Sequence, residues 1–168
     1  MNKKTKRIAF IGLCTSLALV FAYLEALIPP LLPSVPGVKM GLPNIIIIFL
    51  LYRFGPKTAI AVSFLRIILV TALFGNAMAM LYSLAGGFFS IVLMILLKKL
   101  NILSTVGVSV AGGVAHNAGQ IIVAMLVLDT TQIAYYLVVL TVSGIAAGVF
   151  IGLCGSVLIK KLPEKLSF

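Results

Sequence analysis

The sequence predicts an all-α integral membrane protein: one membrane domain, residues 1–168, with six transmembrane helices and both termini in the cytoplasm. Hydrophobic residues make up 62% of the chain, well above the roughly 45–50% of a soluble domain, and so small a chain has too little interior to bury them. These residues form runs long enough to cross a bilayer. The basic residues gather in short segments between the runs, as in multi-pass membrane proteins.

Six apolar runs approach the roughly 20 residues that a spanning helix needs. Their approximate ranges are 8–28, 40–54, 58–74, 77–97, 106–128 and 133–159. The first follows a basic segment, Lys3 to Arg7, which resembles the start of a signal peptide. However, this run is too long for the apolar part of a signal peptide, and no small-x-small cleavage site precedes Pro29. We therefore expect a retained first helix.

The second run is the least regular element. Its apolar centre, Leu42 to Tyr52, is too short to cross a bilayer cleanly. Four prolines break the helical pattern before it, which predicts a stiff loop over residues 29–39. The second helix is therefore extended by residues 39–41, tilted, or inserted only part of the way into the membrane.

The basic residues predict the orientation, because cytoplasmic loops are enriched in Lys and Arg. Eleven of the 13 lie on one side, at the two ends of the chain and in the segments 53–57 and 98–99, whereas Lys39 lies on the other side and Arg66 lies inside the third run. This asymmetry predicts that both termini lie on the cytoplasmic side of a bacterial cell membrane. We expect membrane lipid to surround the helices. No aromatic residues alternate with the basic clusters, so a nucleic-acid partner is not expected.

Small residues at helical spacing indicate close contacts between helices in lipid. They are Ala18, Ala22 and Ala26 in the first run and Gly144, Gly148 and Gly152 in the sixth. We predict that the glycines pack within this chain, and that the alanines pack either within it or against a second protein. Cys14 and Cys154 have no metal-ligand partner nearby, so both are interpreted as small packing residues.

Polar side chains inside the apolar runs are the candidate binding residues, because polar groups in the hydrocarbon face the protein interior or a wet cavity. Arg66 lies near the middle of its run, as a ligand for an anion or carbonyl or as a structural group. His116, Asn117 and Gln120 fall within one helical turn, either as a binding cluster or as structural side chains. Further candidates for ligand binding are Glu25, Lys39, Asn44, Asn76, Tyr82 and Ser83.

Several enzyme motifs are missing. Residues 55–58 contain Gly, Lys and Thr but lack the spacing of a P-loop, so ATP hydrolysis is not expected. The three acidic residues, Glu25, Asp129 and Glu164, form no paired motif that would hold Mg²⁺ and a diphosphate. No catalytic triad or metal cluster is evident. We therefore expect a non-enzymatic protein without a cofactor.

Three stretches resemble a known family. They are residues 18–29 (ALVFAYLEALIP), 39–44 (KMGLPN) and 115–120 (AHNAGQ), with Leu65-Arg66 and residues 84–87 (LAGG) between them. In this order, and over nearly the whole chain, they resemble the Gx transporter family. That family is also catalogued as heptaprenyl diphosphate synthase component I. It is similar to the substrate-binding S components of energy-coupling factor (ECF) transporters.

The resemblance implies a six-helix protein that binds a small molecule near the outer face, below a lid that residues 29–39 would form. It implies a membrane coupling subunit with two ATPases as partners, contacted through the alanine stripe at Ala18, Ala22 and Ala26. The expected ligand is anionic or bears a carbonyl, such as a cofactor, a quinone or an isoprenoid precursor. Two alternatives stay open: a non-catalytic membrane accessory subunit of heptaprenyl diphosphate synthase, and a stand-alone oligomeric channel or exporter.

Overall fold

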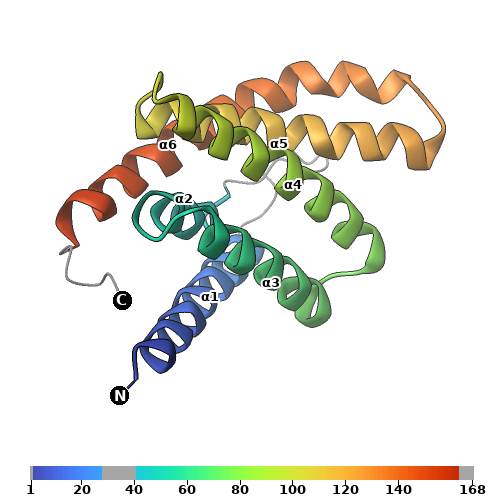
Figure 1. Ribbon diagram of the computed structural model, residues 1–168. Coiled ribbons are helices and arrows are strands. Elements are labelled where there is room, and N and C mark those ends of the chain that lie inside the picture. Colours follow the sequence, from blue (N-terminus) through green and yellow to red (C-terminus); the bar gives the residue numbers. More distant parts are fainter. Residues whose placement is uncertain (1, 28–40, 163–168) are drawn as a thin grey trace.

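The computed structural model describes residues 2–27 and 41–162, and all regular structure in these ranges is helical (Figure 1). The elements are α1 (Lys3–Leu27), α2 (Asn44–Arg53), α3 (Pro56–Phe74), α4 (Ala77–Leu100), α5 (Thr105–Leu128), the 3-10 helix η1 (Gln132–Tyr135) and α6 (Tyr136–Lys161). The predicted all-α class is therefore confirmed. The first helix begins before the predicted apolar run because the basic segment ahead of that run is also helical.

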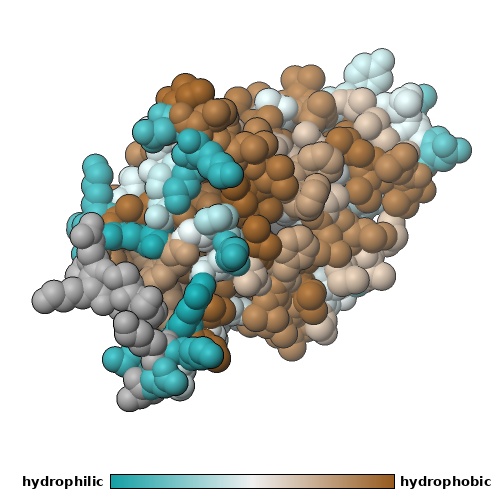
Figure 2. Space-filling view, viewed as in Figure 1, coloured by the Kyte–Doolittle hydropathy of each residue, from teal (hydrophilic) through white to brown (hydrophobic). Residues whose placement is uncertain are grey.

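Five helices in the described ranges are long and apolar enough to cross a membrane: α1, α3, α4, α5, and α6 together with η1. Their spans of 19 to 30 residues match or exceed the length that a bilayer requires. Figure 2 shows hydrophobic residues over the middle of the bundle and hydrophilic residues gathered at one end. The chain is therefore a multi-pass membrane protein.

The second helix differs from the others. α2 has 10 residues, and the seven from Ile45 to Leu51 are all buried. A helix that is apolar on every side is stable when other helices surround it, and α2 lies against α3 and α6. Its length is about 15 Å, roughly half of a bilayer's hydrocarbon thickness. The prediction of six spanning helices is therefore not confirmed, and the loop predicted before α2 lies outside the described residues.

The C-terminal helices form the most closely packed part of the bundle. α5 packs along both α4 and α6, whereas α1 contacts α3 and α2 at the edge of the molecule (Figure 1). Glycines on α6 permit the α5–α6 contact: a Cβ added to Gly148 would lie 2.5 Å from Val110 Cα, and one added to Gly152 would lie 2.7 Å from Val106 Cα. This confirms the prediction that these glycines pack within the chain.

The beginning of α1 and the end of α6 lie at the same end of the bundle, together with the α2–α3 and α4–α5 turns (Figure 1). This is the hydrophilic end in Figure 2. Basic residues occupy the last turns of α2, α4 and α6, namely Arg53, Lys98, Lys99, Lys160 and Lys161. We refer to it as the basic end. Its orientation toward the cytoplasm stays a prediction.

Two of these basic side chains tie helix ends together. Arg53 donates hydrogen bonds from Nη2 to the carbonyl oxygens of Ile159 and Leu162 at the end of α6. Lys98 Nζ donates to the Leu51 carbonyl oxygen of α2 at 2.6 Å. The last carbonyls of a helix have no partner within it, so these bonds satisfy groups that would otherwise lie unpaired near the apolar core.

We expect Arg53→Ala to lower the free energy of unfolding by about 1–3 kcal/mol, because hydrogen bonds from a charged donor contribute on that order. Lys57, an exposed side chain in the first turn of α3, is the control. Lys57→Ala should change stability by less than about 0.5 kcal/mol. Thermal unfolding in detergent measures both variants, and an equal effect of the two substitutions would contradict the capping role.

Candidate ligand-binding site

A cavity of about 240 Å³ lies inside the bundle, and all six α-helices contribute to its lining. Its lining extends to Ala26 near the end of α1 and to Gly75 in the α3–α4 turn. The α3–α4 turn lies on the side of the molecule away from the basic end (Figure 1). On its inner side the cavity reaches Asn44, the first residue of α2. The cavity therefore extends from one end of the bundle to the level where the half-length helix begins.

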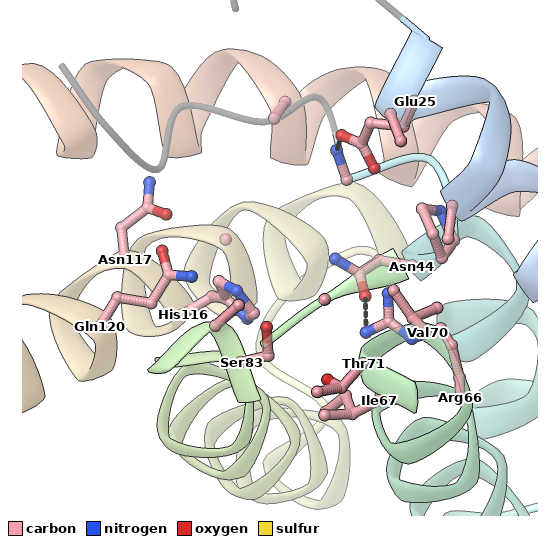
Figure 3. A pocket seen from close by; sticks show the side chains of 18 of the residues that line it. Glu25, Asn44, Arg66, Ile67, Val70, Thr71, Ser83, His116, Asn117 and Gln120 are labelled. Atoms are coloured by element: carbon pink, nitrogen blue, oxygen red, sulfur yellow. Dashed lines mark hydrogen bonds between the residues drawn. The ribbon is translucent and has the colours of Figure 1, made fainter. Parts of the chain in front are cut away.

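Arg66 extends from the middle of α3 into this cavity. Its Nη2 donates to Asn44 Oδ1 over 3.4 Å, a long hydrogen bond, as Figure 3 shows. Its Nε is buried and has no hydrogen-bond partner among the described residues. A guanidinium has five N–H donors, and an unsatisfied buried donor costs roughly 1–3 kcal/mol, more when it is charged. Arg66 therefore retains at least one N–H donor that no described residue satisfies.

Glu25 on α1 brings the opposite charge into the same cavity. Its Oε1 accepts a hydrogen bond from the backbone N–H of Gly41. Gly41 has a φ of +72°, a conformation that glycine adopts without strain, so this turn can present its N–H to the carboxylate. Figure 3 places Glu25, Asn44 and Arg66 on one side of the cavity.

His116 and Gln120 on α5 face these groups from the other side, with Ser83 of α4 beside them (Figure 3). The His116 ring lies directly against the α4 backbone. A Cβ added to Gly86 would be 2.9 Å from both Cε1 and Nε2 of that ring. Because residue 86 is a glycine, the imidazole can lie at this point of the cavity wall. Hydrogen-bond donors and acceptors thus line both sides of an otherwise apolar space.

Asn117 also lines the cavity, but its amide has a structural partner. Its Nδ2 donates a hydrogen bond to the Leu140 carbonyl oxygen of α6, and the side chain is buried. Ser143 Oγ donates to the same oxygen at 3.0 Å. Within the predicted cluster, Asn117 therefore links α5 to α6, and His116 and Gln120 line the cavity beside it.

One known protein family matches most of the chain. A family model described as heptaprenyl diphosphate synthase component I matches residues 14–158. The chain belongs to this family. The matched range includes every residue that lines the cavity. No curated protein and no solved structure matches the chain.

The other candidate residues of this family member lie in different places. Asn76 is exposed and caps α4, its Oδ1 accepting from the backbone N–H of Ala79 at 2.8 Å, and it does not line the cavity. Tyr82 lines a second cavity of about 330 Å³, between α4, α5 and α6. Lys39 lies outside the described residues.

The alanine stripe of α1 faces the rest of the chain only in part, because Ala26 is exposed. Ala18 is fully buried in the apolar core, and Ala22 and Ala26 line the cavity. Contact between this stripe and a second protein stays a prediction. Thr71 on α3 also lines the cavity and was not predicted. Threonine is common in membrane helices, where it can bond to its own backbone, so nothing in the sequence distinguishes it.

Because Gly86 provides the space for His116, we expect Gly86→Ala to displace the imidazole and weaken ligand retention. Gly12→Ala on α1 is the control, because nothing lies within 4 Å of a Cβ added there and Gly12 does not line the cavity. Native mass spectrometry of the two variants compares the fraction of protein that carries co-purified ligand. If Gly86→Ala retained as much ligand as the wild type, His116 would not contribute to ligand binding.

Proposed function

We propose that this protein is the substrate-binding membrane subunit of an ECF-type uptake transporter in a bacterial cell membrane. The observation that carries the proposal is the cavity within the membrane-spanning bundle, lined by a guanidinium whose Nε has no partner in the described part of the chain. A charged group in the hydrocarbon is costly and usually marks a substrate or ion pathway. A purely structural arginine would be expected to have its donors satisfied by the protein.

The cavity lining indicates the chemistry of the substrate. Arg66 supplies donors for an anionic or carbonyl oxygen, and Gln120 and Ser83 add groups that donate or accept. The remaining wall is largely apolar, through residues such as Ile67, Val70 and Phe74. Ligand sites typically combine such an apolar lining with a few convergent polar groups. A small molecule with one anionic or carbonyl group fits this description, as a cofactor, a quinone or an isoprenoid precursor does.

The proposal includes a transport arrangement. The chain would cross the membrane six times, with α2 and the residues before it together forming the second crossing. Both termini would lie in the cytoplasm, so the cavity would open outward, away from the basic end. A membrane coupling subunit with two ATPases would supply the energy, and the protein itself would catalyse no reaction.

Native mass spectrometry of gently purified protein tests this function. The proposal expects a small molecule bound in a 1:1 ratio. When purified from its native membrane, the protein should also retain a membrane subunit and two ATPases. Removing the subunits with harsher detergent should leave the small molecule bound, because its site lies within this chain. Recovery of the chain without either a ligand or these subunits would contradict the proposal.

The family description supports a second candidate, a non-catalytic membrane accessory subunit of heptaprenyl diphosphate synthase. This function predicts that a soluble prenyl synthase co-purifies with the chain and that the cavity holds no vitamin-like ligand. The same mass spectra distinguish the two functions, since the mass of the co-purified subunit identifies either an ATPase pair or a synthase. The buried guanidinium at the cavity favours the transporter.

A further inference from the structure

We infer that the ligand is an amphiphile: its polar head occupies the main cavity, and its apolar chain passes Gln120 into the second cavity. This inference rests on the proposed function and names the class of its substrate. The second cavity lies between α4, α5, η1 and α6, with a volume of about 330 Å³. Its lining is mostly apolar, with Ile121, Ala124, Ile133 and Leu140 among its residues. An apolar cavity of about 150 Å³ holds a benzene ring, so this one has room for an apolar group of roughly ten carbons.

The two cavities share one stretch of wall. Gln120 lines both of them. On α4, Ser83 lines the main cavity, and its neighbour Tyr82 lines the second one. Between α5 and α6, the hydrogen bond from Asn117 to Leu140 joins a residue of the main cavity to a residue of the second.

Gln120 is the movable part of this wall. Its amide makes no hydrogen bond within the described residues, and its side chain can adopt several rotamers. A change of rotamer would therefore break no hydrogen bond among the described residues, and Gln120 is the side chain through which we expect a path between the two spaces to open. A polar site and an apolar site joined in this way match a molecule that is polar at one end and apolar at the other.

The charges limit the kind of head group. Arg66 and Glu25 both line the main cavity, so the described residues there carry one positive and one negative group. With a single guanidinium as the cationic partner, the head carries at most one negative charge or is a neutral carbonyl. A diphosphate would bring several negative charges to one guanidinium beside a carboxylate. A carboxylate is the simplest head that fits, because a guanidinium binds it through two parallel hydrogen bonds.

Straight-chain carboxylates test the inference, because their head stays constant while the chain grows. The full-length protein is placed in phosphatidylcholine nanodiscs, and its affinity for acetate, hexanoate and decanoate is measured, with empty nanodiscs correcting for partition into lipid. Full burial of a methylene from water strengthens binding by about fourfold. We expect decanoate to bind at least tenfold more tightly than hexanoate, which allows for partial burial.

Ala124→Phe should fill the second cavity and remove this advantage of decanoate, leaving acetate affinity unchanged. Ala124→Leu, a smaller change, should reduce the advantage in part and guards against loss of folding. Ala146→Phe is the matched control: it makes the same substitution at an exposed position on α6 that lines neither cavity. The control should bind all three carboxylates as the wild type does.

Two results would overturn the inference. If the three carboxylates bind equally and only Arg66→Met weakens them, the ligand has no apolar chain, while the proposed function stands. If native mass spectra show a phospholipid that Ala124→Phe expels, and no carboxylate competes with it, the second cavity holds lipid. A failure of the proposed function would instead be seen as loss of both ligand and ATPases in the native spectra of unmodified protein.

Discussion

Replacing Arg66 with methionine is expected to lower ligand affinity by about tenfold to a hundredfold without lowering the stability of the fold. The first effect follows from the guanidinium, since hydrogen bonds that involve a charged group contribute roughly 1.5–3 kcal/mol each, and 1.4 kcal/mol corresponds to tenfold. Methionine keeps a long unbranched side chain, so the cavity wall remains filled. A ligand with an anionic or carbonyl head would then lose its main donor.

The stability effect separates a binding role from a structural one. In the described structure Arg66 makes one long hydrogen bond, to Asn44, and leaves Nε unpaired. Replacing a buried charge with an apolar side chain is often neutral or stabilising, whereas removing one member of a tight ion pair is strongly destabilising. Glu25 keeps its bond to Gly41 in the variant. We therefore expect an unchanged or higher melting temperature.

Thermal unfolding and native mass spectrometry of the same samples test both effects. The double variant with Arg66→Met and Glu25→Gln removes the second charge as well, so it should be at least as stable as the single variant. Arg66→Lys keeps a charge but loses the planar fork, and it should recover only part of the affinity. A stability loss in Arg66→Met with unchanged ligand retention would show that the arginine is structural.

Most of the fold could be predicted because the bilayer determines it. The apolar runs 58–74 and 77–97 correspond closely to α3 and α4, since a helix in lipid satisfies its own backbone and its length follows the hydrocarbon thickness. The second run could not be assigned from its length and composition. α2 is buried by α3 and α6 instead of facing lipid along a full crossing. Burial by neighbouring helices depends on tertiary contacts, which hydropathy does not encode.

The polar half of the site could be predicted for the same reason. Arg66, His116 and Gln120 stand out in apolar runs, and lipid drives them toward one another. Their partners were harder to assign: Asn117 binds the α6 backbone, a contact that depends on how closely α5 and α6 approach. Nothing in the sequence predicted the apolar second cavity. Ile121 and Ala124 have the composition of any lipid-facing helix, so only the packing of α4, α5 and α6 reveals that they surround a space.

Alanine in place of Gly148 is expected to lower the free energy of unfolding by about 2 kcal/mol or more. The added methyl group would lie 2.5 Å from Val110 Cα and 3.0 Å from the Ser109 carbonyl oxygen. Both are backbone atoms of α5, so no side chain can move aside, and overpacking of this kind costs typically 1–3 kcal/mol. The helix preference of alanine over glycine, about 1 kcal/mol, offsets part of this cost.

Gly12→Ala makes the same chemical change with the opposite expected sign. Gly12 lies within α1, and nothing is within 4 Å of an added Cβ there, so the helix preference should act alone and stabilise the protein by about 0.5–1 kcal/mol. A thiol-reactive dye can follow unfolding, because Cys14 is buried in the fold. Opposite shifts of the melting temperature would establish close α5–α6 contact.

Because α5 carries His116 and Gln120, forcing these helices apart at Gly148 should also reduce ligand retention, whereas Gly12→Ala should preserve it. If Gly148→Ala were as stable as Gly12→Ala, the two helices would not approach closely enough to build the site described.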